Sequence, residues 1–260
     1  MFQVIKSSFS KLWDNIGVLI PTALIITTIS TLLFLVIPAL RNLEYSAIIL
    51  NVVTFGFYYI YIAITLGSIK QSLEIVRYNK SSIFTLFSGF QLSKILRSLV
   101  AGLIIVLTFV PAIVLSLIVY KPLFLSAEPS IVTLALESIF ILLLFLAITY
   151  ICMRVAFYIY FIVDKNAKII ESLNLSWIAT KGHIGKIVSC SLMLISLELI
   201  LTLISYYLIF GVNNVYILPV KIKYIHYIMN IISPVFLPLT GLVWAQLYVA
   251  LTHKPVNEIE

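Results

Sequence analysis

Two ionisable residues stand inside stretches of the chain that are otherwise almost free of charge. Glu198 lies in the run "SLMLISLELILTLIS", and Arg154 directly follows "LLLFLAITYICM". An ionisable side chain inside a membrane span costs free energy unless it has a partner. A contact between Arg154 and Glu198 would neutralise both groups and join their helices. A proton- or solute-handling role and a contact with a partner subunit are the alternatives for these two residues.

A second set of chemically interesting residues lies in the charged stretch "FIVDKNAKIIESLNLSWIATKGHIGKI", residues 161–187. Asp164 is expected to favour the start of an amphipathic helix, because a negative charge is stabilising near a helix N-terminus. Trp177 is expected to anchor that helix at the membrane interface. Lys181 and Gly182 suit the end of that helix, where cations and glycine are favoured. Recognition of a lipid headgroup or of a partner protein is the alternative role for these residues.

The sequence contains no catalytic motif. We find no G-x-S-x-G, no H-E-x-x-H and no Walker phosphate loop. The three histidines are scattered and lack nearby carboxylates, which does not make a metal site. We therefore predict no catalytic residue, no cofactor and no metal, and we expect a protein that is not an enzyme. Gln246 and Asn230 are expected to join helices through hydrogen bonds rather than bind a solute.

The composition is that of an integral membrane protein. Hydrophobic residues make up 62% of the chain and charged residues 10%, whereas soluble domains carry about 45–50% and about 25%. Several windows hold enough apolar residues to cross a bilayer as helices. We predict a single all-α membrane domain over residues 1–260 with six transmembrane helices, at 16–40, 45–69, 99–120, 131–153, 187–210 and 224–250.

The distribution of Lys and Arg predicts the orientation. Most of them lie before the first, third and fifth predicted spans or after the sixth, and few lie in the segments between. By the positive-inside rule, both termini are cytoplasmic in a multi-pass protein of the cell membrane. The net charge of +7 then lies mostly on the face that meets anionic lipid. This makes membrane lipids the expected partners and nucleic acid a poor one.

Three amphipathic segments precede the odd-numbered spans: "MFQVIKSSFSKLWDNIG", "SSIFTLFSGFQLSKI" and the stretch that contains Trp177. Helices with an apolar stripe, a basic polar face and aromatic residues lie in the membrane interface. We therefore predict three interfacial helices, each followed by two spans. This arrangement suggests a threefold internal repeat, with units at 1–69, 70–163 and 164–252.

The third segment shows the expected faces of such a helix. Its apolar stripe is predicted to face the membrane, and its polar residues are predicted to turn to the opposite face. The stripe comprises Ile169, Ile170, Leu173 and Trp177, and the polar face comprises Lys168, Glu171, Ser172 and Ser176.

The same stretch resembles a pattern found in an uncharacterised group of prokaryotic membrane proteins with about six helices. A related domain forms the membrane part of some glycerophosphodiester phosphodiesterases. The resembling residues are Asp164, the pair Ser176-Trp177 and the pair Lys181-Gly182, and the upstream "LGSIKQSLEIVRYNKSSIFTLFSGF" is similar to that group's first inner loop. The resemblance covers roughly residues 50 to 210. It implies a stand-alone membrane module, with no catalytic residues to carry over.

Two functions are compatible with these features. The first is a non-enzymatic scaffold or accessory subunit of a larger membrane assembly, with protein partners or self-association in the membrane. The alternative is a transporter or handler of a lipid or other amphiphile that uses Glu198 and Arg154. Such proteins need polar groups near the midplane of the bilayer to bind their substrate. Few internal polar groups favour the first function.

Overall fold

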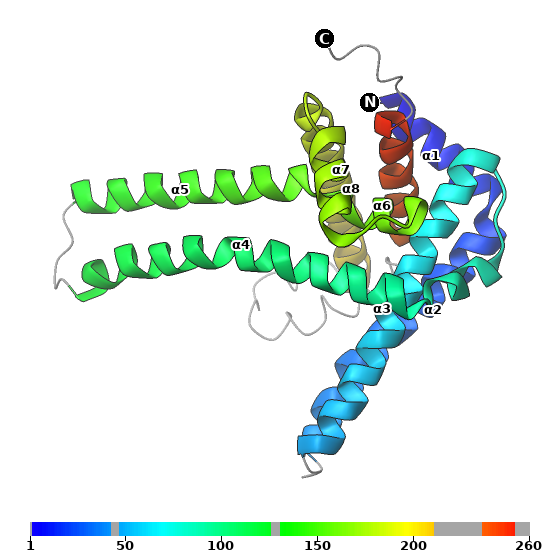
Figure 1. The fold of residues 1–260 in the computed structure, drawn as a ribbon, viewed down its shortest axis with the longest axis horizontal. Helices are drawn as coiled ribbons and strands as arrows, with labels where there is room; N and C mark the ends of the chain where they lie inside the picture. Colours follow the sequence, from blue (N-terminus) through cyan, green and yellow to red (C-terminus); the bar gives the residue numbers. More distant parts are fainter. Residues whose placement is uncertain (1, 43–46, 126–130, 211–235, 253–260) are drawn as a thin grey trace. The chain divides into compact units, whose positions relative to one another are not determined.

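The computed structural model describes residues 2–42, 47–125, 131–210 and 236–252, and these residues form helices and short connections without strands (Figure 1). The all-α prediction is therefore confirmed for the described part of the chain. The helices are α1 (Phe2–Asp14), α2 (Ile16–Asn42), α3 (Ala47–Tyr78), the 3₁₀ helix η1 (Ile83–Gly89), α4 (Leu92–Leu125), α5 (Ile131–Arg154), α6 (Tyr158–Lys165), α7 (Ile169–Ala179), α8 (Ile184–Phe210) and a C-terminal helix (Phe236–Thr252).

Four of the described helices are long and apolar enough to cross a membrane. A fifth span results if α1 and α2, which are bent by 93° at their junction, count as one broken span. The chain is thus a helical protein with several candidate spans. Five of the six predicted spans coincide with α2, α3, α4, α5 and α8. Much of the sixth, at 224–250, lies outside the described residues, so the count of six stays a prediction.

The sharp bend between α1 and α2 is centred on Asn15. Its side-chain Nδ2 donates to the carbonyl of Lys11 at 3.1 Å, at the end of α1. Its own carbonyl accepts from the backbone N–H groups of Val18 and Leu19, both at 3.0 Å, at the start of α2. One residue therefore satisfies backbone groups of both helix ends, which helices leave without intrahelical partners.

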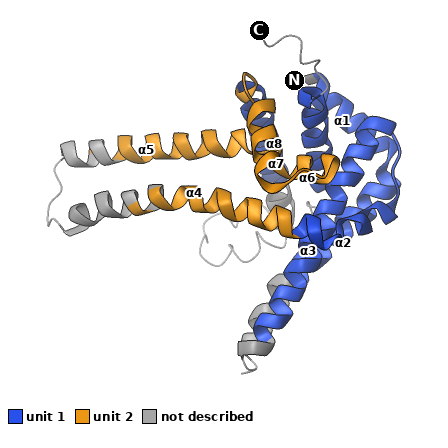
Figure 2. Cartoon of the chain, in the orientation of Figure 1, with its two compact units in different colours: residues 1–95, 185–260 blue, residues 96–184 orange. Residues whose placement is uncertain are grey.

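The chain divides into two compact units, which Figure 2 shows in different colours. Unit 1 comprises residues 1–95 and 185–260, and unit 2 comprises residues 96–184. This division concerns contacts and not ancestry. The threefold repeat with boundaries near residues 69 and 163 therefore stays a prediction.

Unit 1 is built around apolar side chains from α1, α2, α3, α8 and the C-terminal helix. The buried members of this cluster are Ile5, Leu12, Leu19, Ile75, Leu194, Phe236, Leu239, Leu242 and Val243. Gln246 adds polar links between the C-terminal helix and α1. Its Oε1 accepts from Ser8 Oγ at 3.0 Å, and its Nε2 donates to Ser7 Oγ at 2.9 Å. The helix-joining role predicted for Gln246 is confirmed, whereas Asn230 lies outside the described residues.

Two glycines let α3 and η1 pack at backbone distance. A Cβ added to Gly67 would lie 1.9 Å from the carbonyl oxygen of Leu86, and one added to Gly89 would lie 1.8 Å from that of Ala63. Only glycine fits at these positions. Small residues at helix contacts are a common way to bring backbones together in membranes.

The polar face of α7 differs from the prediction, whereas two residues of its apolar stripe are exposed, as a stripe that faces the membrane would be. Ser172 and Ser176 are fully buried, whereas Ile170 is 77% exposed and Trp177 is 40% exposed. The sequence placed the serines on a polar face, which water would cover in an interfacial helix. That expectation is wrong because the small hydroxyl side chains form the packing face of the helix within unit 2.

The other two amphipathic segments also divide their apolar residues between two environments. In η1, Leu86 is buried while Phe84 and Phe87 are exposed. In α1, Leu12 is buried while Trp13 is exposed. The single apolar stripe expected for each segment therefore separates into core residues and exposed aromatic residues.

Candidate functional site

The candidate site of unit 2 begins at a break in the helical chain. Helix α5 ends at Arg154, and α6 starts at Tyr158 after a short turn. A break of this kind frees backbone groups, which must find partners where water is absent. Two hydroxyls of the α7 segment supply them. The carbonyl of Arg154 accepts from Ser176 Oγ at 3.0 Å and from Thr180 Oγ1 at 3.1 Å, and the N–H of Phe157 donates to Ser176 Oγ at 3.1 Å.

Arg154 is held against Trp177. Its guanidinium carbon lies 4.4 Å from the centre of the indole ring, a cation–π contact. Such contacts stabilise a desolvated cation by about 2 kcal/mol. The Arg154 side chain is only 4% exposed, and its Nε has no hydrogen-bond partner among the described residues. The site therefore holds a buried positive charge with an unused donor.

A pocket of about 390 Å³ adjoins Trp177 within unit 2. We call it the Trp177 pocket, and its wall includes Ile104, Ile105, Ile151, Leu173, Asn174 and Trp177. Its volume falls in the range of small-molecule sites, about 300–1,000 Å³. The lining is mostly aliphatic, with a few polar groups such as the Asn174 amide. This arrangement suits a molecule with an apolar chain and a polar end.

Arg97 fixes the far end of α6 in the same unit. Its Nη1 donates to the carbonyl of Asn166 at 2.9 Å and to the Asn166 side-chain oxygen at 3.0 Å. Asn166 follows α6 in a left-handed conformation, with φ at 53°. A cation at a helix C-terminus is favourable. Helices α4 and α6 are thus joined by an interaction that the sequence did not suggest.

The structure brings together two of the predicted site residues, Arg154 and Trp177. Lys181 and Gly182 follow α7 in a turn, where Gly182 has φ at 76°. Asp164 lies in the last turn of α6 and not at the start of α7. The expected helix-starting role belongs instead to Glu171, whose Oε2 accepts from the backbone N–H of Lys168 at 3.1 Å.

Glu198 is half-buried in α8 and belongs to unit 1, whereas Arg154 belongs to unit 2. The pairing of Arg154 with Glu198 stays a prediction.

Ser176 and Thr180 bond the backbone at the break between α5 and α6, a role that the sequence did not suggest for them. Their signal is present in the sequence, because Ser172, Ser176 and Thr180 recur at every fourth position. That spacing places small polar residues along one face of a helix, as in close helix contacts within membranes.

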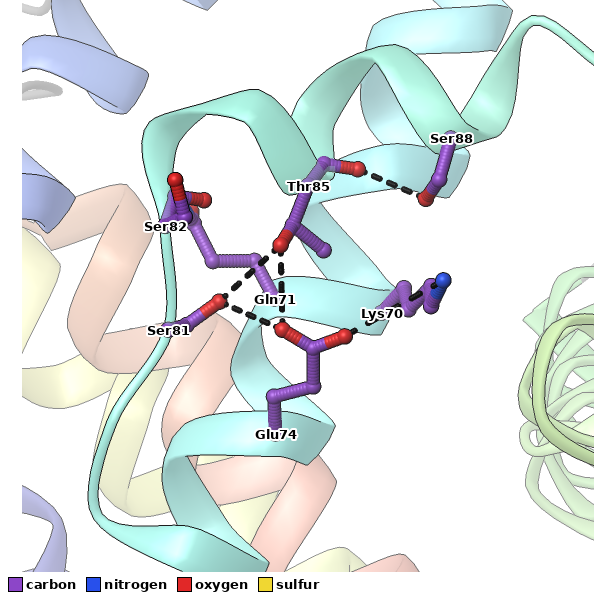
Figure 3. A network of polar contacts seen from close by, with 7 residues as sticks. All are labelled: Lys70, Gln71, Glu74, Ser81, Ser82, Thr85 and Ser88. Atoms are coloured by element: carbon purple, nitrogen blue, oxygen red, sulfur yellow. Dashed lines mark hydrogen bonds and ion pairs between the residues drawn. The ribbon is translucent and has the colours of Figure 1, made fainter.

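Unit 1 has a separate polar network between α3 and η1, which Figure 3 shows. Glu74 Oε2 accepts from Ser81 Oγ at 2.7 Å and from Thr85 Oγ1 at 3.0 Å, and its Oε1 lies 4.0 Å from Lys70 Nζ. Gln71 Nε2 donates to the carbonyl of Ser82 at 3.1 Å. The network connects α3 to the segment that leads into η1.

Comparison of the chain with protein-family models, with curated proteins and with solved structures finds no match. The resemblance to the prokaryotic membrane group therefore stays a prediction.

Proposed function

We propose that the chain is a non-enzymatic membrane protein that binds a lipid or another anionic amphiphile in the Trp177 pocket. The observation that carries this proposal is the apolar pocket beside a tryptophan whose ring holds a buried arginine. An amphiphile has the two parts that such a site recognises. Its chain fits the aliphatic wall. Arg154 does not line the pocket but packs on its Trp177, so the charged group would approach the guanidinium past the indole ring.

The charged end of the ligand would offset the free-energy cost of burying the positive charge of Arg154. Arg154 is a positive charge that is only 4% exposed, and a buried charge is costly unless a partner lies near it. Among the described residues, its Nε–H has no hydrogen-bond acceptor. A phosphate or carboxylate oxygen is the strongest kind of acceptor for arginine. Glu198 is the alternative partner from within the chain.

The membrane architecture of this proposal follows the sequence. It has six spans, interfacial helices α1, η1 and α7 arranged in a threefold repeat, and both termini in the cytoplasm. The 93° bend between α1 and α2 supports a first helix that lies flat before the chain enters the bilayer. The exposed aromatic side chains of Trp13, Phe84 and Trp177 support contact of all three segments with the interface.

A scaffold or accessory subunit is the second candidate, and α5 favours it. Consecutive apolar residues of this helix are exposed around its circumference, among them Ile141, Leu142, Leu143, Phe145 and Leu146. Because 3.6 residues complete one turn, no face of this stretch packs into a core formed by the described residues. A partner helix or the second copy of the chain would cover part of it.

A pair of variants on α4 tests the amphiphile proposal. Ile105→Trp fills the Trp177 pocket from its wall, whereas Leu103→Trp adds the same side chain at an exposed position of the same helix. After mild extraction, native mass spectrometry should show bound phospholipid on the natural protein and on Leu103→Trp. Ile105→Trp should lose it.

The same spectra separate the two candidate functions. Equal lipid binding by both variants would overturn the assignment of the pocket. Stoichiometric protein companions on a lipid-free chain would favour the scaffold instead.

A further inference from the structure

A small cavity lies inside unit 1, among α2, α3 and the C-terminal helix. Its volume is about 30 Å³, and its polar wall consists of Thr22, Ser68, Gln71 and Ser72. We call it the Gln71 cavity. A space that holds a single water needs about 10–15 Å³ on this measure, so the cavity has room for a water or a small ion.

Gln71 brings an unused acceptor to this cavity. The side chain is fully buried, and its Oε1 has no hydrogen-bond partner among the described residues. The orientation of the amide follows from its other end, because the Ser82 carbonyl can only accept and so must face Nε2. A buried carbonyl oxygen without a partner costs about 1–3 kcal/mol. An occupant that interacts with Oε1 would remove this cost.

Two hydroxyls in the wall also present oxygen lone pairs. Thr22 Oγ1 donates to the carbonyl of Val18 at 2.9 Å, and Ser68 Oγ donates to that of Thr65 at 2.8 Å. Their protons are therefore committed to the helix backbone. The oxygens keep lone pairs that accept a donor or coordinate a cation.

We infer that the Gln71 cavity binds a small monovalent cation, with Na⁺ as the fitting size. Hard cations prefer oxygen ligands, and the amide oxygen and hydroxyls are such ligands. None of the residues that line the cavity is charged. Cation sites with fewer charged ligands bind more weakly. We therefore expect a dissociation constant on the order of millimolar.

Occupancy of this cavity would stabilise unit 1. The wall combines residues of three helices: Thr22 and its neighbours on α2, Ser68, Gln71 and Ser72 on α3, and Leu237, Pro238 and Gly241 on the C-terminal helix. A cation that binds only when these elements are assembled shifts the folding equilibrium by mass action. The inference is independent of the Trp177 pocket, which belongs to unit 2.

The test measures thermal unfolding of the purified chain in detergent, in NaCl, KCl or N-methyl-D-glucamine chloride at equal ionic strength. The melting temperature should rise with NaCl and level off at saturation, and the large organic cation should have no such effect. Retention of ²²Na⁺ by the same sample gives a direct second readout.

A matched pair of threonine variants on α2 locates the effect. Thr22→Val keeps the side-chain shape and removes a lining oxygen. Thr27→Val removes a hydroxyl that bonds its own helix in the same way, to the Ala23 carbonyl at 2.9 Å, but does not line the cavity. Thr22→Val should need at least about tenfold more NaCl for half of the shift, as expected for the loss of one interaction with a charged group. Thr27→Val should behave as the natural chain does.

Gly241→Ala provides a steric test. The new methyl carbon would lie 3.0 Å from Ser72 Oγ, at the cavity wall. The variant should lose both the sodium-dependent shift and ²²Na⁺ retention. Identical melting in all three salts, together with no retained ²²Na⁺ on the natural chain, would overturn the inference and leave water as the occupant.

Discussion

Ser176 links three parts of unit 2 through one hydroxyl group. It donates to the carbonyl of Arg154 and accepts from the N–H of Phe157, so both sides of the break between α5 and α6 depend on it. Among the described residues, the hydroxyl of Ser172, one turn earlier, bonds only the Ile169 carbonyl of its own helix. Of the two buried serines, Ser176 therefore connects α7 to other segments, whereas Ser172 bonds within its own helix.

This difference predicts unequal effects of alanine substitution. Ser176→Ala removes the hydroxyl that bonds both the Arg154 carbonyl and the Phe157 N–H, and it should lower the free energy of unfolding by about 1–3 kcal/mol. Ser172→Ala, the matched control, should cost less than about 1 kcal/mol because the Ile169 carbonyl keeps its backbone donors. Thermal unfolding in detergent measures both. Equal losses would contradict the role given to Ser176.

Arg154 and Glu198 are best tested together. If they pair, removing either leaves a buried charge, and each single variant should be destabilised by about 3–5 kcal/mol. The double variant Arg154→Met with Glu198→Leu should then be more stable than the sum of the single effects predicts. Additive losses in this double-mutant cycle would show that the two side chains do not interact, leaving Arg154 to Trp177 and to an external anion.

At the scale of the elements, helix ends are held by cations from other helices. Lys11 of α1 donates from Nζ to the carbonyl of Ile75 at 3.4 Å and to that of Val76, in the last turns of α3. Burial lowers the pKa of Lys11, so its charge carries a desolvation cost that the two carbonyls offset. Arg97 serves the end of α6 in the same manner.

The contact between α3 and η1 gives a prediction about glycine. Gly67→Ala would force a Cβ to within 1.9 Å of the Leu86 carbonyl oxygen, so η1 must move and the folded fraction in detergent should fall sharply. Gly56→Ala on the same helix meets no atom within 4 Å and should be neutral or stabilising, by up to about 1 kcal/mol from helix propensity. A stable Gly67→Ala variant would contradict this packing.

The elements also show what the sequence can and cannot predict. Long apolar runs located α2, α3, α4, α5 and α8, since span length depends on local composition. The burial of Ser172 and Ser176 was not predicted because periodicity alone cannot distinguish a hydroxyl that packs from one that is solvated. The Arg154–Trp177 contact depends on the turn at 155–157, which no pattern in the sequence specifies.

At the scale of the whole molecule, the orientation predicted from Lys and Arg can be measured by cysteine labelling. In a chain with Cys152→Ala and Cys190→Ala, a cysteine in place of Lys80 should react only after the membrane is opened. A cysteine in place of Arg41, on the side predicted to be outside, should react with an impermeant reagent on intact cells. The reverse pattern would contradict the positive-inside assignment.

The most direct test of the account is photochemical labelling with an anionic phospholipid that carries a diazirine on its acyl chain. Peptide mapping should find adducts concentrated in the segments that line the Trp177 pocket, around residues 104–108 and 170–177. Ile105→Trp should abolish them, and Leu103→Trp should not. Labels spread evenly over exposed apolar residues, such as Leu199 and Leu203 of α8, would mean that lipid only surrounds the protein and would contradict a specific amphiphile site.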